Sequence, residues 1–114
     1  INPTIAEVEC GLLNAMGLPN PGAEVYANEI HLVKKEGIKT IASIYGGSVS
    51  EFVKVAKIVA EAGADAVELN VSCPHVETVG MQIGQDPKLV RDITGAVKSE
   101  IHVPLFTKPS EQWL

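Results

Sequence analysis

The chain has 114 residues, of which 46% are hydrophobic and 20% charged, with a mean hydropathy of +0.17 and a formal net charge of −5. This is enough apolar material for one folded domain, and the scattered basic residues form no stripe that could bind nucleic acid or an anionic membrane. No apolar run approaches the roughly 18 residues of a membrane-spanning helix and no leader segment is recognisable, so we expect a cytoplasmic protein.

The first predicted elements are an amphipathic helix and a buried strand. The helix spans residues 22–37 and ends at Gly37, and residues 38–44 (IKTIASI) are an almost continuous apolar, β-branched run. Such a run is typical of a parallel strand that is covered on both faces. The glycine pair at residues 46–47 interrupts the run before the next helix.

The second predicted helix, over residues 48–63, carries both start and stop signals. Ser48 and Glu51 stand at the spacing of a capping box, and Gly63 is a natural end. Helical spacing places four apolar residues on one face: Phe52, Val55, Ala56 and Val59.

The rest of the chain repeats the strand–helix–strand alternation. We expect a strand over residues 64–70, a helix over 86–100 that starts at Asp86 and Pro87, and a strand over 102–108. The apolar face of this helix comprises Leu89, Ile93, Ala96 and Val97. Two α/β architectures fit: a doubly wound sheet, or part of a (βα)8 barrel, and both place chemistry at the carboxyl ends of the strands.

Neither a disulfide framework nor a metal site is indicated. Cys10 and Cys73 lie far apart without a paired Cys or His spacing, and His31 and His102 have no ligand partner at metal spacing. We therefore expect no metal, and any cysteine with a role to act alone.

The loop after the strand at 64–70 gathers polar side chains. Cys73, between Ser72 and His75, could be a nucleophile or a proton acceptor, although a free core cysteine is the alternative. Asn70 presents a donor and an acceptor together, which suits the edge of a pyrimidine or similar cyclic imide. Its alternative role is to make the turn that follows the strand.

A second unusual stretch precedes the first helix, and a lysine ends the last strand. LLNAMGLPNPG (12–22) interleaves glycines and asparagines with apolar residues, so its backbone N–H groups could hold a carboxylate, or it could be an ordinary loop. Lys108 is either a buried cation with a role or a solvated strand end.

Taken together, these stretches resemble the dihydroorotate dehydrogenase family, the flavin enzymes of pyrimidine synthesis. LNAMGLPNPG and ELNVSCPHV are similar to the two substrate loops of that family, in the same order, and GQDPKLV is similar to the start of its next helix. The resemblance covers nearly the whole chain. It implies a (βα)8 barrel that holds FMN above the strand ends.

The resemblance also implies roles for single residues. Cys73 matches the catalytic base of the soluble class, which takes a proton from C5 of dihydroorotate while C6 passes hydride to FMN. Substrate-binding positions match Asn14, Met16, Gly17, Leu18, Asn70 and His75. The Met16–Leu18 backbone corresponds to the segment that holds the substrate carboxylate. Lys108, with Asn70, matches the flavin-binding positions, where a positive charge stabilises the reduced ring.

The chain departs from the family pattern in three places. His75 stands where many members have Asn, and SCPH with GQDP also resembles dihydropyrimidine dehydrogenase; the carboxylate loop favours dihydroorotate. Residues 109–114 do not follow the expected strand-end pattern. The first strand and the later strands, with the flavin-phosphate site, are missing.

These departures, together with a first residue that is Ile1 and not Met, predict a fragment. We expect residues 1–114 to form about three to four βα units of one barrel. Uncovered apolar edges would promote association, and soluble family members resemble homo-oligomers or heterotetramers. The electron acceptor stays open: fumarate, or NAD through a separate iron–sulfur flavoprotein subunit. A non-catalytic module that binds a pyrimidine or a partner is the alternative from another class.

Overall fold

The computed structural model describes residues 3–72 and 83–109. A parallel sheet in the order β3-β4-β5 is built from β3 (Ile41–Ile44), β4 (Ala66–Asn70) and β5 (Leu105–Lys108). The helices are α1 (Ala23–Lys35), α2 (Val49–Glu61), the short 3₁₀ helix η1 (Ile83–Gln85) and α3 (Pro87–Glu100). An antiparallel pair, β1 (Ile5–Val8) and β2 (Gly11–Asn14), precedes them. The predicted α/β class with a parallel sheet is confirmed.

The predicted helix signals work as expected at the start and end of α2. Ser48 Oγ accepts a hydrogen bond from the Glu51 N–H at 3.2 Å, so the cap is confirmed. The Glu51 carboxylate also accepts a hydrogen bond, but from the N–H of Gly47 at 2.8 Å and not from that of Ser48, the partner that a capping box predicts. Gly63 follows the helix with φ +102°, a conformation that favours glycine, and Ala64 N–H reaches back to the carbonyl of Val59 at 3.1 Å.

All three parallel strands begin later than the sequence predicts. The N–H of Thr40 donates to the Asp65 carboxylate at 2.9 Å, so residues 38–40 do not enter a ladder and β3 starts at Ile41. Pro104 has no N–H, and β5 accordingly starts at Leu105. A hydrogen bond from the backbone to a side chain therefore sets the start of β3, and a proline sets the start of β5. The apolar pattern of the sequence alone predicts strands that are too long.

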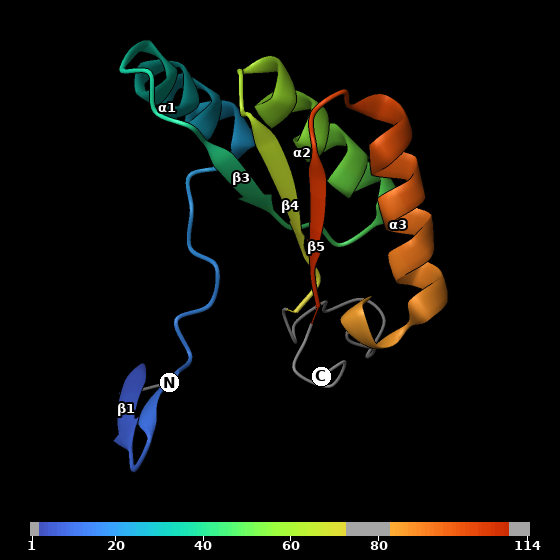
Figure 1. The fold of residues 1–114 in the computed structure, drawn as a ribbon. Coiled ribbons are helices and arrows are strands. Elements are labelled where there is room, and N and C mark those ends of the chain that lie inside the picture. Colours follow the sequence, from blue (N-terminus) through green and yellow to red (C-terminus); the bar gives the residue numbers. More distant parts are fainter. Residues whose placement is uncertain (1–2, 73–82, 110–114) are drawn as a thin grey trace.

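The β1–β2 hairpin was not predicted. Ile5 pairs with Asn14 and Val8 with Gly11, which leaves Glu9 and Cys10 as a two-residue turn. This pair lacks the Asn-Gly type of signal that marks such turns. The hairpin stands apart from the parallel sheet (Figure 1), and the residues of both strands are exposed.

The helices cover one face of the parallel sheet (Figure 1). Val67 and Leu69 of β4 are fully buried and pack in one cluster with Phe52, Ile93 and Val97 from the helices. Within residues 3–72 and 83–109, no helix is long and apolar enough to cross a bilayer.

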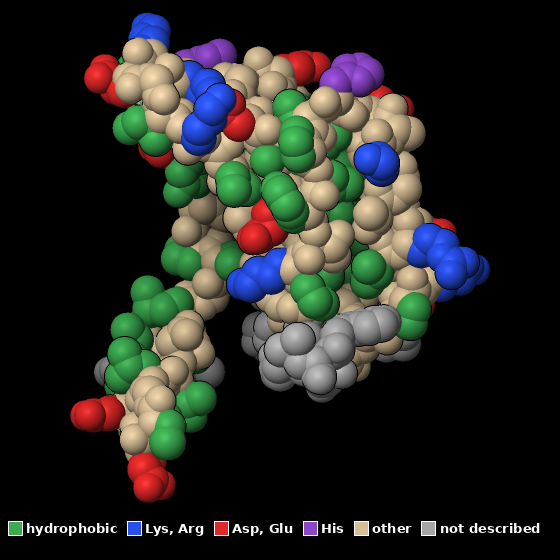
Figure 2. Space-filling view, in the orientation of Figure 1, with side chains coloured by type: hydrophobic (Ala, Val, Ile, Leu, Met, Phe, Trp, Pro, Cys, Tyr) green, Lys and Arg blue, Asp and Glu red, His purple; other side chains and the backbone are tan. Residues whose placement is uncertain are grey.

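The opposite face of the sheet is uncovered. Side chains alternate along a strand, so the neighbours of the buried Val67 and Leu69 point away from the helices. We call this surface the open face, and its members are Ile41, Ser43, Glu68, Asn70, Phe106 and Lys108. Ile41 is 61% exposed and Phe106 52% exposed. Figure 2 looks onto this side, where hydrophobic side chains surround acidic and basic ones.

Candidate active site at the carboxyl end of the sheet

Two predicted site residues lie side by side where β4 and β5 end. Asn70 and Lys108 are register partners, and the Val71 N–H donates to the Lys108 carbonyl at 3.2 Å. Register partners in a parallel pair share a face, so the amide and the ammonium group both belong to the open face. The structure thus brings the two expected cofactor positions together.

The side-chain oxygen of Asn70 makes the turn after β4, and its side-chain NH₂ group is left available. Its Oδ1 accepts from the N–H of Ser72 at 3.2 Å and from Ser72 Oγ at 2.6 Å. Its Nδ2 has no acceptor in the part of the chain that the structure describes. The turn-making interpretation therefore holds for the oxygen, which already accepts two hydrogen bonds, and only the N–H donors of the amide remain for a ligand.

The Met16–Leu18 segment turns at Gly17 and leaves backbone N–H groups without an acceptor among the described residues. Gly17 has φ +72°, and an added Cβ would meet no atom within 4 Å, so only the backbone conformation favours glycine there. The N–H of Met16 is 3.5 Å from Asn14 Oδ1, whereas those of Gly17 and Leu18 have no acceptor among the described residues. Two N–H donors are thus available in sequence.

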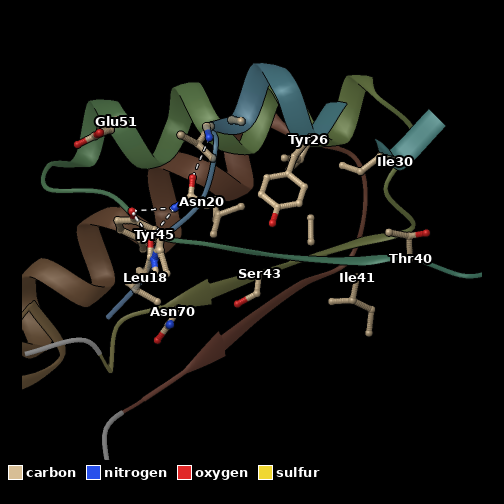
Figure 3. A pocket seen from close by; sticks show the side chains of 17 residues that line it. Leu18, Asn20, Tyr26, Ile30, Thr40, Ile41, Ser43, Tyr45, Glu51 and Asn70 are labelled. Carbon is tan, nitrogen blue, oxygen red and sulfur yellow. Dashed lines mark hydrogen bonds between the residues drawn. The ribbon is translucent and has the colours of Figure 1, made fainter. Parts of the chain in front are cut away.

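A pocket of about 630 Å³ runs along the free edge of β3, between α1, α2 and the segment before α1. Leu18 and Asn70 both line it, and Figure 3 shows them at the same end. Asn14 and Met16 do not line this pocket; both are exposed. The structure therefore brings one residue of the predicted carboxylate segment to the strand ends and leaves the others on the hairpin side.

Sequence reasoning missed one residue at this end of the pocket. Tyr45 follows β3, and its hydroxyl contacts both Asn20 and the carbonyl of Leu18 (Figure 3). An aromatic residue with a polar tip directly after a strand was the available signal. Tyr45 begins the sequence YGGS, whose glycine pair predicts only a turn.

The predicted base and its neighbour, Cys73 and His75, lie outside the described residues. Val71 and Gly84, which are described residues before and after this part of the chain, lie together at the carboxyl end of the sheet. A Cβ on Gly84 of η1 would stand 2.2 Å from the carbonyl oxygen of Val71, the residue after β4. This close approach means that the chain leaves β4 and returns beside it.

Two charged groups on the sheet have different surroundings. Glu68, on the open face, accepts a hydrogen bond from Ser43 Oγ at 2.7 Å. Asp65, at the opposite end of the strands, is paired with Lys34, Thr40 and Lys39, and these contacts lower the pKa of its carboxyl well below the ordinary value. Asp65 thus stabilises the amino end of the sheet and is not part of the candidate site.

Metal-binding side chains do not converge in the described ranges. No three His, Cys, Asp or Glu side chains there could hold a metal ion. Cys10 is a free, exposed cysteine in the turn of the hairpin.

Comparison with known proteins decides the family. The profile described as "Dihydroorotate dehydrogenase" matches residues 1–111. The chain belongs to the dihydroorotate dehydrogenase family. The resemblance that the two loops and the following helix indicated is confirmed.

The matched relatives are much longer than the chain. It is 49% identical over 107 residues to the "Dihydroorotate dehydrogenase B (NAD(+)), catalytic subunit" of Methanocella arvoryzae, covering 94% of the chain and 35% of the relative. The proteins of the same name from Thermoplasma acidophilum and Methanocaldococcus jannaschii are 45% and 49% identical, covering 95% and 94% of the chain and 36% of each relative. The chain thus spans about a third of the length of these relatives.

Proposed function

We propose that the chain forms the substrate-facing part of an FMN-dependent dihydroorotate dehydrogenase, which oxidises dihydroorotate to orotate in pyrimidine synthesis. The observation that carries this proposal is the pairing of Asn70 with Lys108 at the strand ends, beside Leu18, in a chain of this family. In this proposal the Lys108 cation and the Asn70 amide serve the flavin. The backbone N–H groups near Leu18 serve the carboxylate of the substrate.

The residues at the strand ends suit FMN. Lys108 is exposed at the end of β5, and the Asn70 amide keeps its N–H donors free of partners in the described ranges. In this proposal both hold the pyrimidine edge of the flavin ring, where a fixed positive charge favours the reduced, anionic form. FMN, when bound, would supply the acceptor for the hydride that leaves C6 of the substrate.

The remaining roles concern the substrate itself. Cys73 would take the proton from C5, and the N–H groups of Gly17 and Leu18 would hold the carboxylate. Asn14, Asn70 and His75 would grip the pyrimidine ring. Because Asn14 and Met16 are exposed and outside the pocket, this assignment requires the hairpin to lie over the strand ends when substrate is bound.

We further propose that residues 1–114 are part of a single (βα)8 barrel in a longer catalytic subunit. The free edges of β3 and β5 would pair with further strands, and the open face would become the barrel interior. The relatives are named for NAD⁺ and as catalytic subunits. In this proposal the protein acts in the cytoplasm, as a homo-oligomer, with a separate iron–sulfur flavoprotein subunit.

The base assignment is tested by Cys73→Ala in the full-length protein that contains this chain. We expect anaerobic reduction of the bound flavin by dihydroorotate to slow by about a hundredfold or more, because a positioned general base contributes about 10²–10⁴ in rate. The measurement is the loss of flavin absorbance in a stopped-flow instrument. An unchanged rate would remove Cys73 from the mechanism.

Two competing functions, a dihydropyrimidine dehydrogenase and a non-catalytic binding module, predict other results. Faster reduction by dihydrouracil than by dihydroorotate would indicate a dihydropyrimidine dehydrogenase. A purified protein without flavin that still binds orotate would indicate a non-catalytic pyrimidine-binding module.

A further inference from the structure

We propose that Tyr45 is a positioning residue that holds the Met16–Leu18 segment in its anion-binding form. This inference rests on the proposed function, because it takes that segment as the site of the substrate carboxylate. Tyr45 lies directly after β3, at the carboxyl end of the sheet.

Two hydrogen bonds join Tyr45 to the loop, and a third within the loop completes the cluster. Its hydroxyl donates to the carbonyl of Leu18 at 3.3 Å and accepts from Asn20 Nδ2 at 3.0 Å. Asn20 Nδ2 also donates to the same Leu18 carbonyl at 2.8 Å. The carbonyl of Leu18 is thus held from two sides, and one of them comes from 27 residues further along the chain.

Asn20 links the same cluster to the first turn of α1. Its Oδ1 accepts from the Gly22 N–H at 2.9 Å, and Gly22 is the cap residue of that helix. Both the strand and the helix therefore anchor the loop (Figure 3).

Fixing the Leu18 carbonyl restrains the adjoining backbone, because only the φ and ψ of Leu18 separate this peptide group from the one that carries the Leu18 N–H. Leu18 is followed by Pro19, which has no N–H, so this peptide group can only accept. The N–H groups of Gly17 and Leu18 belong to the two preceding peptide groups and have no acceptor among the described residues. A carboxylate then meets donors that are already oriented, which lowers the entropy lost on binding.

The test is Tyr45→Phe in the full-length, flavin-loaded protein, because this change removes only the hydroxyl group. We expect the Kd for orotate, from titration of the flavin absorbance, to rise about three- to tenfold, the size of one neutral hydrogen bond. KM for dihydroorotate should rise by the same factor, while the rate of flavin reduction at saturation stays unchanged. Hydrogen exchange of the Gly22 amide, which donates to the Asn20 side chain that Tyr45 holds, should become faster.

Tyr26→Phe is the matched control. Tyr26 lines the same pocket from α1, and its hydroxyl has no hydrogen-bond partner among the described residues, so orotate affinity and exchange should both stay at the wild-type level. Equal effects in the two variants would overturn the proposal. So would a Tyr45→Phe protein with wild-type affinity and exchange, or one that loses only the saturated rate.

The exchange measurement separates this inference from the proposed function. If the wild-type protein neither binds orotate nor is reduced by dihydroorotate, the proposed function fails. Faster exchange of the Gly22 amide in Tyr45→Phe would then still support the positioning role, and unchanged exchange would overturn it.

Discussion

At the amino end of the sheet a single carboxylate joins three elements. Asp65 accepts from Lys34 Nζ of α1 at 2.6 Å, from the N–H of Thr40 at 2.9 Å and from Lys39 Nζ at 3.1 Å. Its side chain is 26% exposed, and these three contacts, with the Lys34 hydrogen bond first, keep its pKa well below the ordinary value. The ionised form therefore stabilises the fold, whereas the protonated form does not.

Asp65→Asn should destabilise the chain in a pH-dependent way. A carboxyl whose pKa is lowered by folding contributes stability above its unfolded pKa, about 3.9, and loses it as the pH falls below that value. The wild-type chain should thus need more urea to unfold than the variant at pH 5–7, and the difference should shrink as the pH falls below about 4. A difference in urea midpoint that is constant down to pH 3 would contradict the assignment.

Single residues also show where sequence reasoning succeeds and where it stops. Asn70 and Lys108 were found because each ends a predicted parallel strand, and such ends meet at one edge of a sheet. Tyr45 and Asp65 were missed because their partners lie 25 or more residues away, and no local pattern encodes such a side-chain hydrogen bond. Whether Cys73 is the base stays a prediction.

Among the elements of the fold, η1 packs tightly against the end of β4. The backbone of Gly84 packs against the carbonyl of Val71, so near that a Cβ would stand 2.2 Å from the oxygen. Both residues are buried. The contact fixes the entry to α3 beside the strand end that carries Asn70.

Gly84→Ala should destabilise the chain by about 1–3 kcal/mol, the usual range for forcing a methyl group into a packed site. The measurement is the free energy of unfolding in urea. Gly95→Ala is the control: an added Cβ on this exposed residue of α3 meets no atom within 4 Å, and the change should stabilise the helix by about 0.5–1 kcal/mol. Destabilisation of similar size by both substitutions would contradict the role of the close contact.

The elements themselves were mostly predictable, for identifiable reasons. Side-chain caps at Ser48 and Asp86 and the glycine after α2 mark helix ends locally, so the three helices were placed within about two residues. The hairpin was not predicted, because its turn residues Glu9 and Cys10 give no turn signal and its strands are exposed on both faces. Without a buried face, a strand leaves no alternating pattern to find.

For the whole molecule, the helices bury one face of a small sheet and leave the other open. Large apolar side chains such as Ile41 and Phe106 remain exposed there, and β3 and β5 each keep one unpaired edge. Such edges and patches favour association with further strands. Together with relatives of which the chain covers about 35%, this supports the proposal that the open face becomes the interior of a barrel.

The most direct test of the account is a chimaera in which this chain replaces the 107-residue segment it matches in the Methanocella arvoryzae catalytic subunit. The account predicts that the chimaera binds flavin and that dihydroorotate bleaches it anaerobically, because in the proposed function the chain would supply the base and the substrate-binding residues. A folded, flavin-loaded chimaera that dihydroorotate leaves oxidised, alongside a native subunit that is reduced, would contradict it.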